Sequence, residues 1–166
     1  MKTIASILLI FCSSLTAVAQ ILPEFNEKPA YFDSKTKQLR ELEKSQYNTI
    51  AKAKGLFKAE GGFMLNGISS PIKLTKQDEL KFVVKLTPGM DPTSVFDLVQ
   101  FEVRKDQRVF ITTQAKTTST TTSFEKIVYE VKKIKDGYYY LIVKNLDQGE
   151  YFFGAKDFMF AFAVVL

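Results

Sequence analysis

Short runs of β-branched and aromatic residues, separated by turn residues, fill the chain from about residue 68 onward and predict β-strands. This pattern is typical of a β-sandwich or barrel. The predicted strands are Ile68–Leu74, Leu80–Leu86, Val95–Val103, Val109–Thr113, Phe124–Ile134, Tyr138–Val143, Glu150–Phe153 and Phe158–Val165. We therefore expect an all-β fold over most of the chain.

Three dipeptides predict the turns between these strands. Asn66-Gly67 and Asp136-Gly137 tolerate two successive positive φ angles, so each predicts a tight hairpin. Pro88-Gly89 suits a type II turn. Within Phe124–Ile134 the alternation places most apolar groups on one face, which predicts a strand with its other face in solvent.

The last predicted strand differs from the others because Phe158–Leu166 contains no polar residue. Phenylalanines alternate along one face, and Met159, Ala161 and Ala163 lie on the other. Both faces must therefore be covered. We favour coverage by neighbouring parts of the chain; the alternative is a strand that inserts into, or accepts, a partner strand in an assembly.

Residues Lys37–Lys54 fit two interpretations. A rough helical spacing relates Leu39, Leu42, Gln46, Ile50 and Ala53 and would give a short helix. However, Tyr31–Asp33 followed by Gln38–Leu42 also fits a β-hairpin, and the apolar helical stripe is thin. We favour the β interpretation.

Nine of the twelve residues from Thr112 to Ser123 are Ser or Thr. This composition favours a long polar hairpin whose register is weakly specified, because neither face of such strands is apolar. The alternative is a hydroxyl-rich surface that contacts sugars or carries O-linked glycans.

The segment Leu146–Tyr151 places Leu, Gly and Tyr where the chain leaves one strand and enters the next. It resembles the tyrosine corner of immunoglobulin-like and fibronectin-like sandwiches, in which the Tyr hydroxyl bonds to backbone a few residues upstream. Tyr151 is then a residue of the fold. The expected architecture is an antiparallel, immunoglobulin-like (Greek-key) β-sandwich.

A series of short motifs in a fixed order spans most of the chain. These are Lys28–Tyr31, Leu39–Lys44, Gly61-Gly62, Gly67–Ser70, Asp91-Pro92, Lys105–Arg108 and the C-terminal Gly-Glu-Tyr-x-Phe of Gly149–Phe153. In these motifs the chain resembles a family of small, exported bacterial β-sandwich proteins without a known activity. The resemblance implies a fold and carries no functional residues.

The N-terminus predicts export. Lys2 gives a basic head, an apolar stretch follows to Leu15, and Ala17-Val18-Ala19 fits the small-x-small pattern of signal peptidase cleavage. The apolar stretch is shorter than a membrane-spanning helix requires. We expect residues 1–19 to be a cleaved signal peptide and residues 20–166 to form a single domain that is periplasmic, on the outer surface or extracellular.

Several chemistries are excluded by composition. The only cysteine, Cys12, is lost with the signal, and the chain has no histidine. Thiolate and histidine metal sites, disulfides, and nucleophiles activated by histidine are therefore excluded. The remaining candidates for catalysis have no distinguishing context: the acids Asp91, Asp97 and Glu102, and a possible dyad of Ser69 or Ser70 with Lys73. We expect no catalytic residues, metal or cofactor.

Positive charge is concentrated near the N-terminus, where residues 28–58 hold eight basic and three acidic residues. The basic residues are Lys28, Lys35, Lys37, Arg40, Lys44, Lys52, Lys54 and Lys58. A solvated face is the favoured explanation. As an anion-binding surface, the segment would suit lipid headgroups or acidic polysaccharide rather than nucleic acid, since no nucleic-acid-binding signature is present.

Two further clusters are candidates for binding. Tyr138, Tyr139 and Tyr140 send successive rings to opposite faces of a strand, so at least one ring is exposed and able to stack on a sugar or a protein partner. Arg104, Lys105 and Arg108 flank a tight turn and are able to hold a carboxylate or phosphate.

Taken together, the sequence predicts a non-enzymatic, exported binding or structural module of the bacterial envelope. One alternative is a domain that binds carbohydrate or anionic glycan through Tyr and the basic segment. Another is a subunit of a surface assembly that uses its apolar C-terminal strand. The expected partners are an envelope protein or a glycan.

Overall fold

The computed structural model describes residues 21–166 except 54–57, 117–118 and 123–124, so the predicted signal peptide lies outside the described residues. Apart from one short helix, α1 (Pro92–Val95), the regular elements of the described residues are strands. The strands are β1 (Ala30–Phe32), β2 (Leu39–Glu41), β3 (Glu43–Gln46), β4 (Asn48–Ala53), β5 (Lys58–Asn66), β6 (Lys73–Thr75), β7 (Glu79–Lys85), β8 (Asp97–Gln100), β9 (Glu102–Arg104), β10 (Gln107–Lys116), β11 (Ser119–Thr122), β12 (Glu130–Lys135), β13 (Tyr138–Lys144), β14 (Gly149–Gly154) and β15 (Phe158–Val165). The all-β prediction is confirmed.

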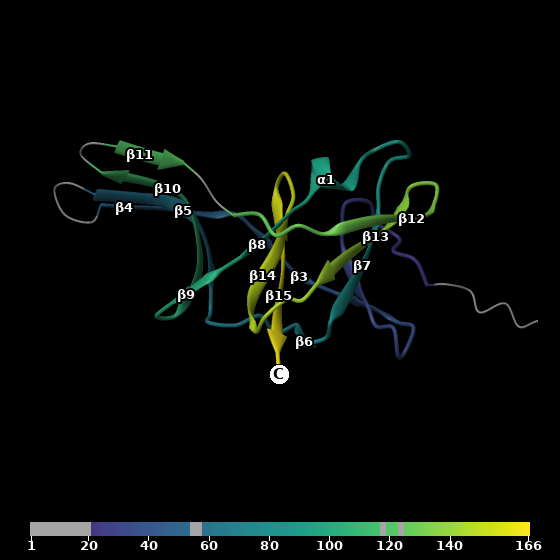
Figure 1. Cartoon of the computed structure of the whole chain (residues 1–166). Coiled ribbons are helices and arrows are strands. Elements are labelled where there is room, and N and C mark those ends of the chain that lie inside the picture. The colour runs from purple at the N-terminus through teal and green to yellow at the C-terminus, as the bar shows by residue number, and fades with distance from the viewer. Residues whose placement is uncertain (1–20, 54–57, 117–118, 123–124) are drawn as a thin grey trace, which may run out of the picture.

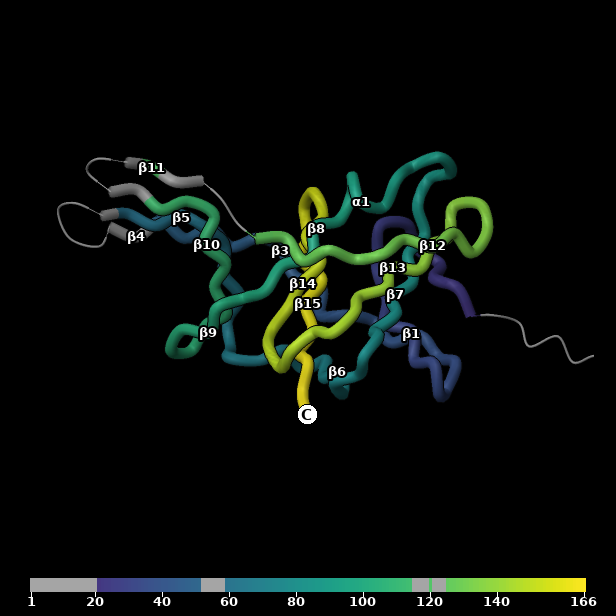
Figure 2. Tube along the Cα trace, in the orientation of Figure 1, coloured from purple at the N-terminus to yellow at the C-terminus, as the bar shows by residue number. Residues whose placement is uncertain are grey.

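The strands form three sheets (Figure 1). The first sheet has the order β12-β13-β7-β1-β2. The central sheet has the order β3-β15-β14-β8, with β6 added in parallel to the end of β15. The third sheet has the order β11-β10-β5-β4, with β9 also paired to β10. Strands β4, β5, β10 and β11 reach away from the other two sheets (Figure 2).

The central sheet is buried on both of its faces, and β15 shows this most clearly. Phe160 and Phe162 belong to the larger hydrophobic cluster, which fills the space against the first sheet. Met159 and Ala161 belong to a second cluster, which includes Leu65 of the third sheet. The prediction that both faces of the last strand are covered is therefore confirmed, and the cover comes from the chain itself.

Both edges of β15 are also occupied. The strand pairs with β14 on one side, and with β3 and then β6 on the other. An assembly of copies through this strand would need an exposed apolar face or a free edge. Because β15 presents neither, the fold gives no support to the assembly alternative.

The N-terminal third is β-structure, as favoured from the sequence. Strands β1 and β2 form an antiparallel hairpin in which Tyr31 lies opposite Arg40. In the turn, the Asp33 carboxylate accepts hydrogen bonds from the backbone N–H groups of Lys35 and Thr36, at 2.8 and 3.1 Å. The helical alternative for residues 37–54 is wrong for its described part, Lys37–Ala53, because β2, β3 and β4 occupy that range.

Two of the three predicted turns are confirmed. Gly89 has φ +88°, and the Met90 N–H donates to the carbonyl oxygen of Thr87 at 3.1 Å, as in a type II turn. Asp136-Gly137 joins the paired strands β12 and β13, with Gly137 at φ +75°. Asn66-Gly67 is not a hairpin turn, because β5 pairs with β10 and β4 whereas β6 pairs with β15.

Three predicted strands are wrong in their extent. Most of Ile68–Leu74 is a loop, and only Lys73–Thr75 forms a strand, because the chain there crosses from the third sheet to the central sheet. Val95–Val103 is divided between α1, β8 and β9, since the chain changes sheets at Phe101. The strand predicted for Phe124–Ile134 begins only at Glu130.

The Thr-rich segment forms the predicted polar hairpin in its described part, where β10 and β11 pair antiparallel.

The hydrogen bond expected of a tyrosine corner is also present. The Tyr151 hydroxyl donates to the carbonyl oxygen of Asp147 at 3.0 Å, and Tyr151 is buried.

Within the described residues, no helix combines the length and apolar character needed to cross a membrane.

Candidate functional site

The three consecutive tyrosines of β13 point to alternate faces of the first sheet, as β geometry requires. Tyr139 packs against the larger hydrophobic cluster between the first and central sheets. Tyr138 and Tyr140 lie on the outer face and are partly exposed. Of the three predicted candidates, these two share the outer face, whereas Tyr139, also partly exposed, packs on the opposite face.

Lysines from the neighbouring strands surround the two outer tyrosines. On β7, Lys85 lies opposite Tyr138, and Lys81 lies on the same outer face two positions beyond Val83. On β12, Lys132 lies opposite Tyr140, and Lys135 lies opposite Tyr138. We call this surface the tyrosine–lysine face; it is made of Lys81, Lys85, Lys132, Lys135, Tyr138 and Tyr140.

Two of these lysines lie beside the ring of Tyr138. The Lys135 ammonium is 4.8 Å from the ring centroid, and the Lys85 ammonium is 5.9 Å from it. Such cation–π contacts hold the ammonium groups next to the ring. The ring of Tyr140 contacts the ring of Phe32 on β1, with the ring centroids 5.8 Å apart and the planes tilted by 57°.

The tyrosine–lysine face carries more positive charge than its own carboxylates neutralise. Lys81 pairs with Glu79 at 2.9 Å, and this hydrogen bond lowers the pKa of Glu79. In the described part of the chain, Lys85, Lys132 and Lys135 form no ion pair with a carboxylate; Lys85 donates instead to the carbonyl oxygen of Glu24 at 2.9 Å. Three ammonium groups are thus available to an external anion.

The structure separates the three members of the predicted basic cluster. Arg104 bonds to Glu60 at 2.8 Å and Glu102 at 2.6 Å, and these hydrogen bonds raise its pKa. Lys105 occupies the turn between β9 and β10 with φ +54° and is exposed. Arg104 and Lys105 line a cavity of about 470 Å³, in which the Arg104 charge is already neutralised.

Arg108 lies elsewhere and is only 1% exposed. Its guanidinium makes two hydrogen bonds to Glu43, at 2.7 and 2.8 Å, and lies 3.8 Å from Glu150. It also donates to the carbonyl oxygens of Asn66 and Gly67. These bonds join β10 to β3, to the end of β5 and to Gly67 just after it, so we assign Arg108 a role in holding the third sheet against the central sheet.

The acidic catalytic candidates each have a local partner in the fold. Asp91 caps α1 by accepting hydrogen bonds from the Thr93 N–H and hydroxyl, and the backbone bond lowers its pKa. Asp97 pairs with Lys126 at 2.7 Å, whereas Glu102 pairs with Arg104. Each of these carboxylates is thus accounted for by a contact within the fold.

The candidate serine dyad also has a structural explanation. Ser70 is buried; its backbone N–H donates to Glu150, and its hydroxyl accepts from the Ile72 N–H. Lys73 is exposed on β6. Among the described residues, no group of three or more acidic, histidine or cysteine side chains is arranged to hold a metal ion.

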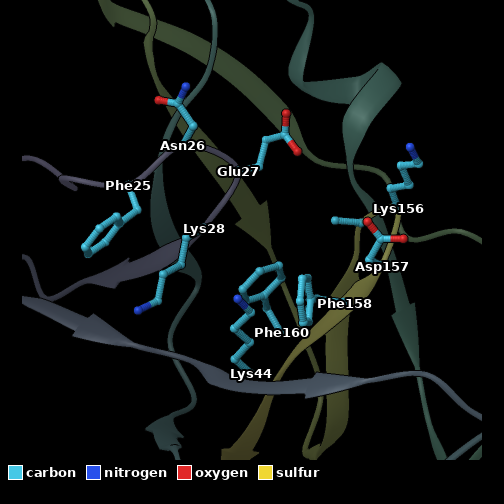
Figure 3. A pocket seen from close by; sticks show the side chains of 10 residues that line it. Phe25, Asn26, Glu27, Lys28, Lys44, Lys156, Asp157, Phe158 and Phe160 are labelled. Atoms are coloured by element: carbon cyan, nitrogen blue, oxygen red, sulfur yellow. The ribbon is translucent and has the colours of Figure 1, made fainter.

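Two cavities that the sequence did not indicate flank the tip of the β14–β15 hairpin. One, of about 430 Å³, is lined by Glu27, Lys44, Phe158 and Phe160 among others (Figure 3). The other, of about 690 Å³, lies on the third-sheet side, where aromatic rings including Phe63, Phe110 and Phe152 line it. Their lining residues come from distant parts of the chain, so no local motif could have revealed either cavity.

The basic N-terminal segment does not form one surface. Lys35, Lys37 and Arg40 are exposed on the β1–β2 hairpin, whereas Lys44 lies on β3 in the central sheet. Lys28 is paired with Glu41 at 2.7 Å. The side chains of Lys52 and Lys58, and residue Lys54, lie outside the described part of the structure.

Comparison of the chain with models of known protein families, with curated proteins and with solved structures found no match.

Proposed function

We propose that this protein is an exported, non-enzymatic binding module whose tyrosine–lysine face binds an anionic glycan. One observation carries the proposal: a partly exposed tyrosine, Tyr138, lies between the ammonium groups of Lys85 and Lys135. An amphipathic ring stacks well on a sugar, and adjacent ammonium groups pair with carboxylate or sulfate substituents. Export rests on the predicted signal peptide, residues 1–19.

The shape of the face favours a polymer over a small molecule. It spans the outer surface of three adjacent strands, β12, β13 and β7, and the three cavities described above lie elsewhere. Val83 lies between Lys81 and Lys85 on this face and is buried. Long lysine side chains cover apolar surface with their methylene groups while their charges stay in water. A flexible chain with repeating negative charges complements such a surface.

We propose further that the first and central sheets form an immunoglobulin-like sandwich. In that fold one sheet has the strand order A-B-E-D and the other C-F-G. The orders β1-β7-β13-β12 and β8-β14-β15 match this arrangement when β1 is strand A. The tyrosine corner then lies at the start of strand F, its usual position. Strands β2–β5 and β9–β11 are insertions relative to this arrangement. Of these, β2 and β3 lie at the edges of the first and central sheets, and the others build the third sheet.

The glycan proposal is tested by isothermal titration of residues 20–166 with polygalacturonate and with uncharged dextran. We expect polygalacturonate to bind and dextran to bind far more weakly. The double variant Lys132→Gln/Lys135→Gln should lose about tenfold in affinity, because each exposed charge contact contributes up to about 1 kcal/mol. Tyr138→Ala should weaken binding through loss of the stacking surface.

The matched control is Lys73→Gln/Lys105→Gln, which removes the same charge from exposed positions outside the face. This variant should bind polygalacturonate within about twofold of the parent protein if local geometry, rather than net charge, determines affinity. Equal losses in the two double variants, or no binding by the parent protein, would overturn the proposal.

A further inference from the structure

The smaller cavity beside the β14–β15 hairpin combines an aromatic wall with charges of both signs. Its volume of about 430 Å³ is within the range of sites for small molecules. Phe158 and Phe160 of β15 form one wall, and the segment before β1, including Glu27, lies across from them (Figure 3). Lys44 reaches the cavity from β3, and Lys156 and Asp157 reach it from the hairpin tip.

Four of the charged groups around this cavity have no ionic partner within the described part of the chain. No ion pair in the described residues involves Lys44, Lys156, Glu27 or Asp157. Lys28, by contrast, is neutralised by Glu41. The cavity therefore offers two cations and two anions, which matches a ligand that carries both charges.

Two features position Lys44 and the backbone of Glu27 at this cavity. The Lys44 ammonium lies 3.8 Å from the centroid of the Phe158 ring, so a cation–π contact holds it at the cavity wall. Glu27 has φ +55°, a conformation that is costly for a residue other than glycine. Its backbone N–H donates to the carbonyl oxygen of Lys85 at 2.9 Å, which keeps Glu27 across the cavity from Lys44. Strained backbone of this kind concentrates at binding sites.

We propose that this cavity binds a small zwitterion of the amino acid or short peptide class. The ligand's ammonium group lies toward Glu27, its carboxylate lies toward Lys44, and an apolar side chain packs on Phe158 and Phe160. This site is separate from the tyrosine–lysine face and does not depend on the glycan proposal.

The test is isothermal titration of the protein with the dipeptide leucyl-phenylalanine, its N-acetyl derivative and its C-terminal amide. The acetyl group removes the ammonium charge, and the amide removes the carboxylate charge. We expect the parent protein to bind the free dipeptide about tenfold more tightly than either derivative, since each derivative loses a charge-assisted contact.

Two variants assign each charge to its partner. Glu27→Gln should abolish the preference for the free dipeptide over its N-acetyl form and keep the preference over the amide. Lys44→Met, which retains a long apolar side chain beside Phe158, should abolish only the preference over the amide. The control Lys132→Gln/Lys135→Gln should bind the dipeptide like the parent protein, and unchanged thermal unfolding midpoints show that the variants are folded.

The proposal is overturned if the parent protein does not bind the free dipeptide at millimolar concentration. It is equally overturned if the parent binds all three compounds alike, or if both preferences survive in Glu27→Gln and Lys44→Met.

Discussion

Replacing Arg108 with methionine removes the buried cation that joins the third sheet to the central sheet. The guanidinium is 1% exposed and bonds twice to Glu43, whose side chain is 22% exposed. Glu150, with its side chain 9% exposed, lies 3.8 Å away. Methionine fills much of the same volume, so the variant isolates the loss of charge and hydrogen bonds from the loss of packing.

The expected loss in free energy of unfolding is about 3–5 kcal/mol, the usual cost of leaving the partner of a buried ion pair uncompensated. Two carboxylates are left without their cation, and the carbonyl oxygens of Asn66 and Gly67 also lose a donor. Whole domains are stable by only about 5–15 kcal/mol, so this loss is large enough to measure readily.

Urea denaturation followed by far-ultraviolet circular dichroism measures the change. With a slope of about 2 kcal/mol/M, the unfolding midpoint of Arg108→Met should fall by about 2 M. Arg104→Met is the matched control, because Arg104 also pairs with two glutamates but its side chain is 32% exposed. Exposed pairs contribute at most about 1 kcal/mol. Equal losses in the two variants would refute the role assigned to Arg108.

The pH dependence of the free energy of unfolding provides a second test of the Arg108–Glu43 pair. Burial raises the pKa of Glu43, but hydrogen bonds from Arg108 and Ser70 outweigh burial and hold the pKa below its usual value of 4.5. In the parent protein Glu43 therefore contributes stability above pH 4.5, and this is lost as the pH falls through its lowered pKa. In Arg108→Met only the weaker Ser70 hydrogen bond still opposes burial, so the pKa of Glu43 rises above 4.5. The variant should therefore regain stability as the pH falls from 7 towards 5. If the difference in free energy of unfolding between the parent protein and Arg108→Met stays constant between pH 7 and pH 5, Glu43 is not the uncompensated group.

Two further substitutions test packing and the tyrosine corner. In Gly62→Ala the new Cβ would lie 2.1 Å from the Phe110 carbonyl oxygen, so β5 and β10 must separate, and we expect a loss of about 1–3 kcal/mol or more in urea denaturation. Gly61→Ala, whose Cβ would make an ordinary contact at 3.8 Å, should lose less; the reverse order would show that the register of this pair is wrong. Tyr151→Phe removes the hydrogen bond to Asp147 and should lower the thermal unfolding midpoint, with a stability loss of about 1 kcal/mol, whereas an unchanged midpoint would make the bond energetically irrelevant.

The candidate site was only partly predictable from the sequence. Alternation along a strand places Tyr138 and Tyr140 on one face, and this followed from the strand prediction alone. Their lysine neighbours did not follow, because Lys81 and Lys85 belong to β7, which is far from β13 in the chain. The pairing of two distant strands depends on contacts across the whole domain, which no local pattern contains.

Among the predicted turns, too, some depend only on local sequence and others on the pairing of distant strands. Pro88-Gly89 forms its expected turn because the backbone preferences of proline and glycine act within the turn itself. Asn66-Gly67 has similar local chemistry, but only Gly67 adopts a positive φ, and the chain leaves for another sheet. A hairpin needs a following strand that pairs with the preceding one, and the dipeptide does not specify this.

The strand Phe158–Val165 shows which property follows from local sequence alone, and the buried Arg108 shows which property depends on contacts between distant parts of the chain. An unbroken apolar strand must be covered on both faces, because exposing it to water costs free energy in proportion to its area. Which sheets cover it was decided by the folded chain, with the first sheet on one face and the third on the other. The sequence around Arg108 does not distinguish it from a surface arginine. Its burial depends on Glu43 and Glu150, which lie far from it in the sequence and reach it only in the folded chain.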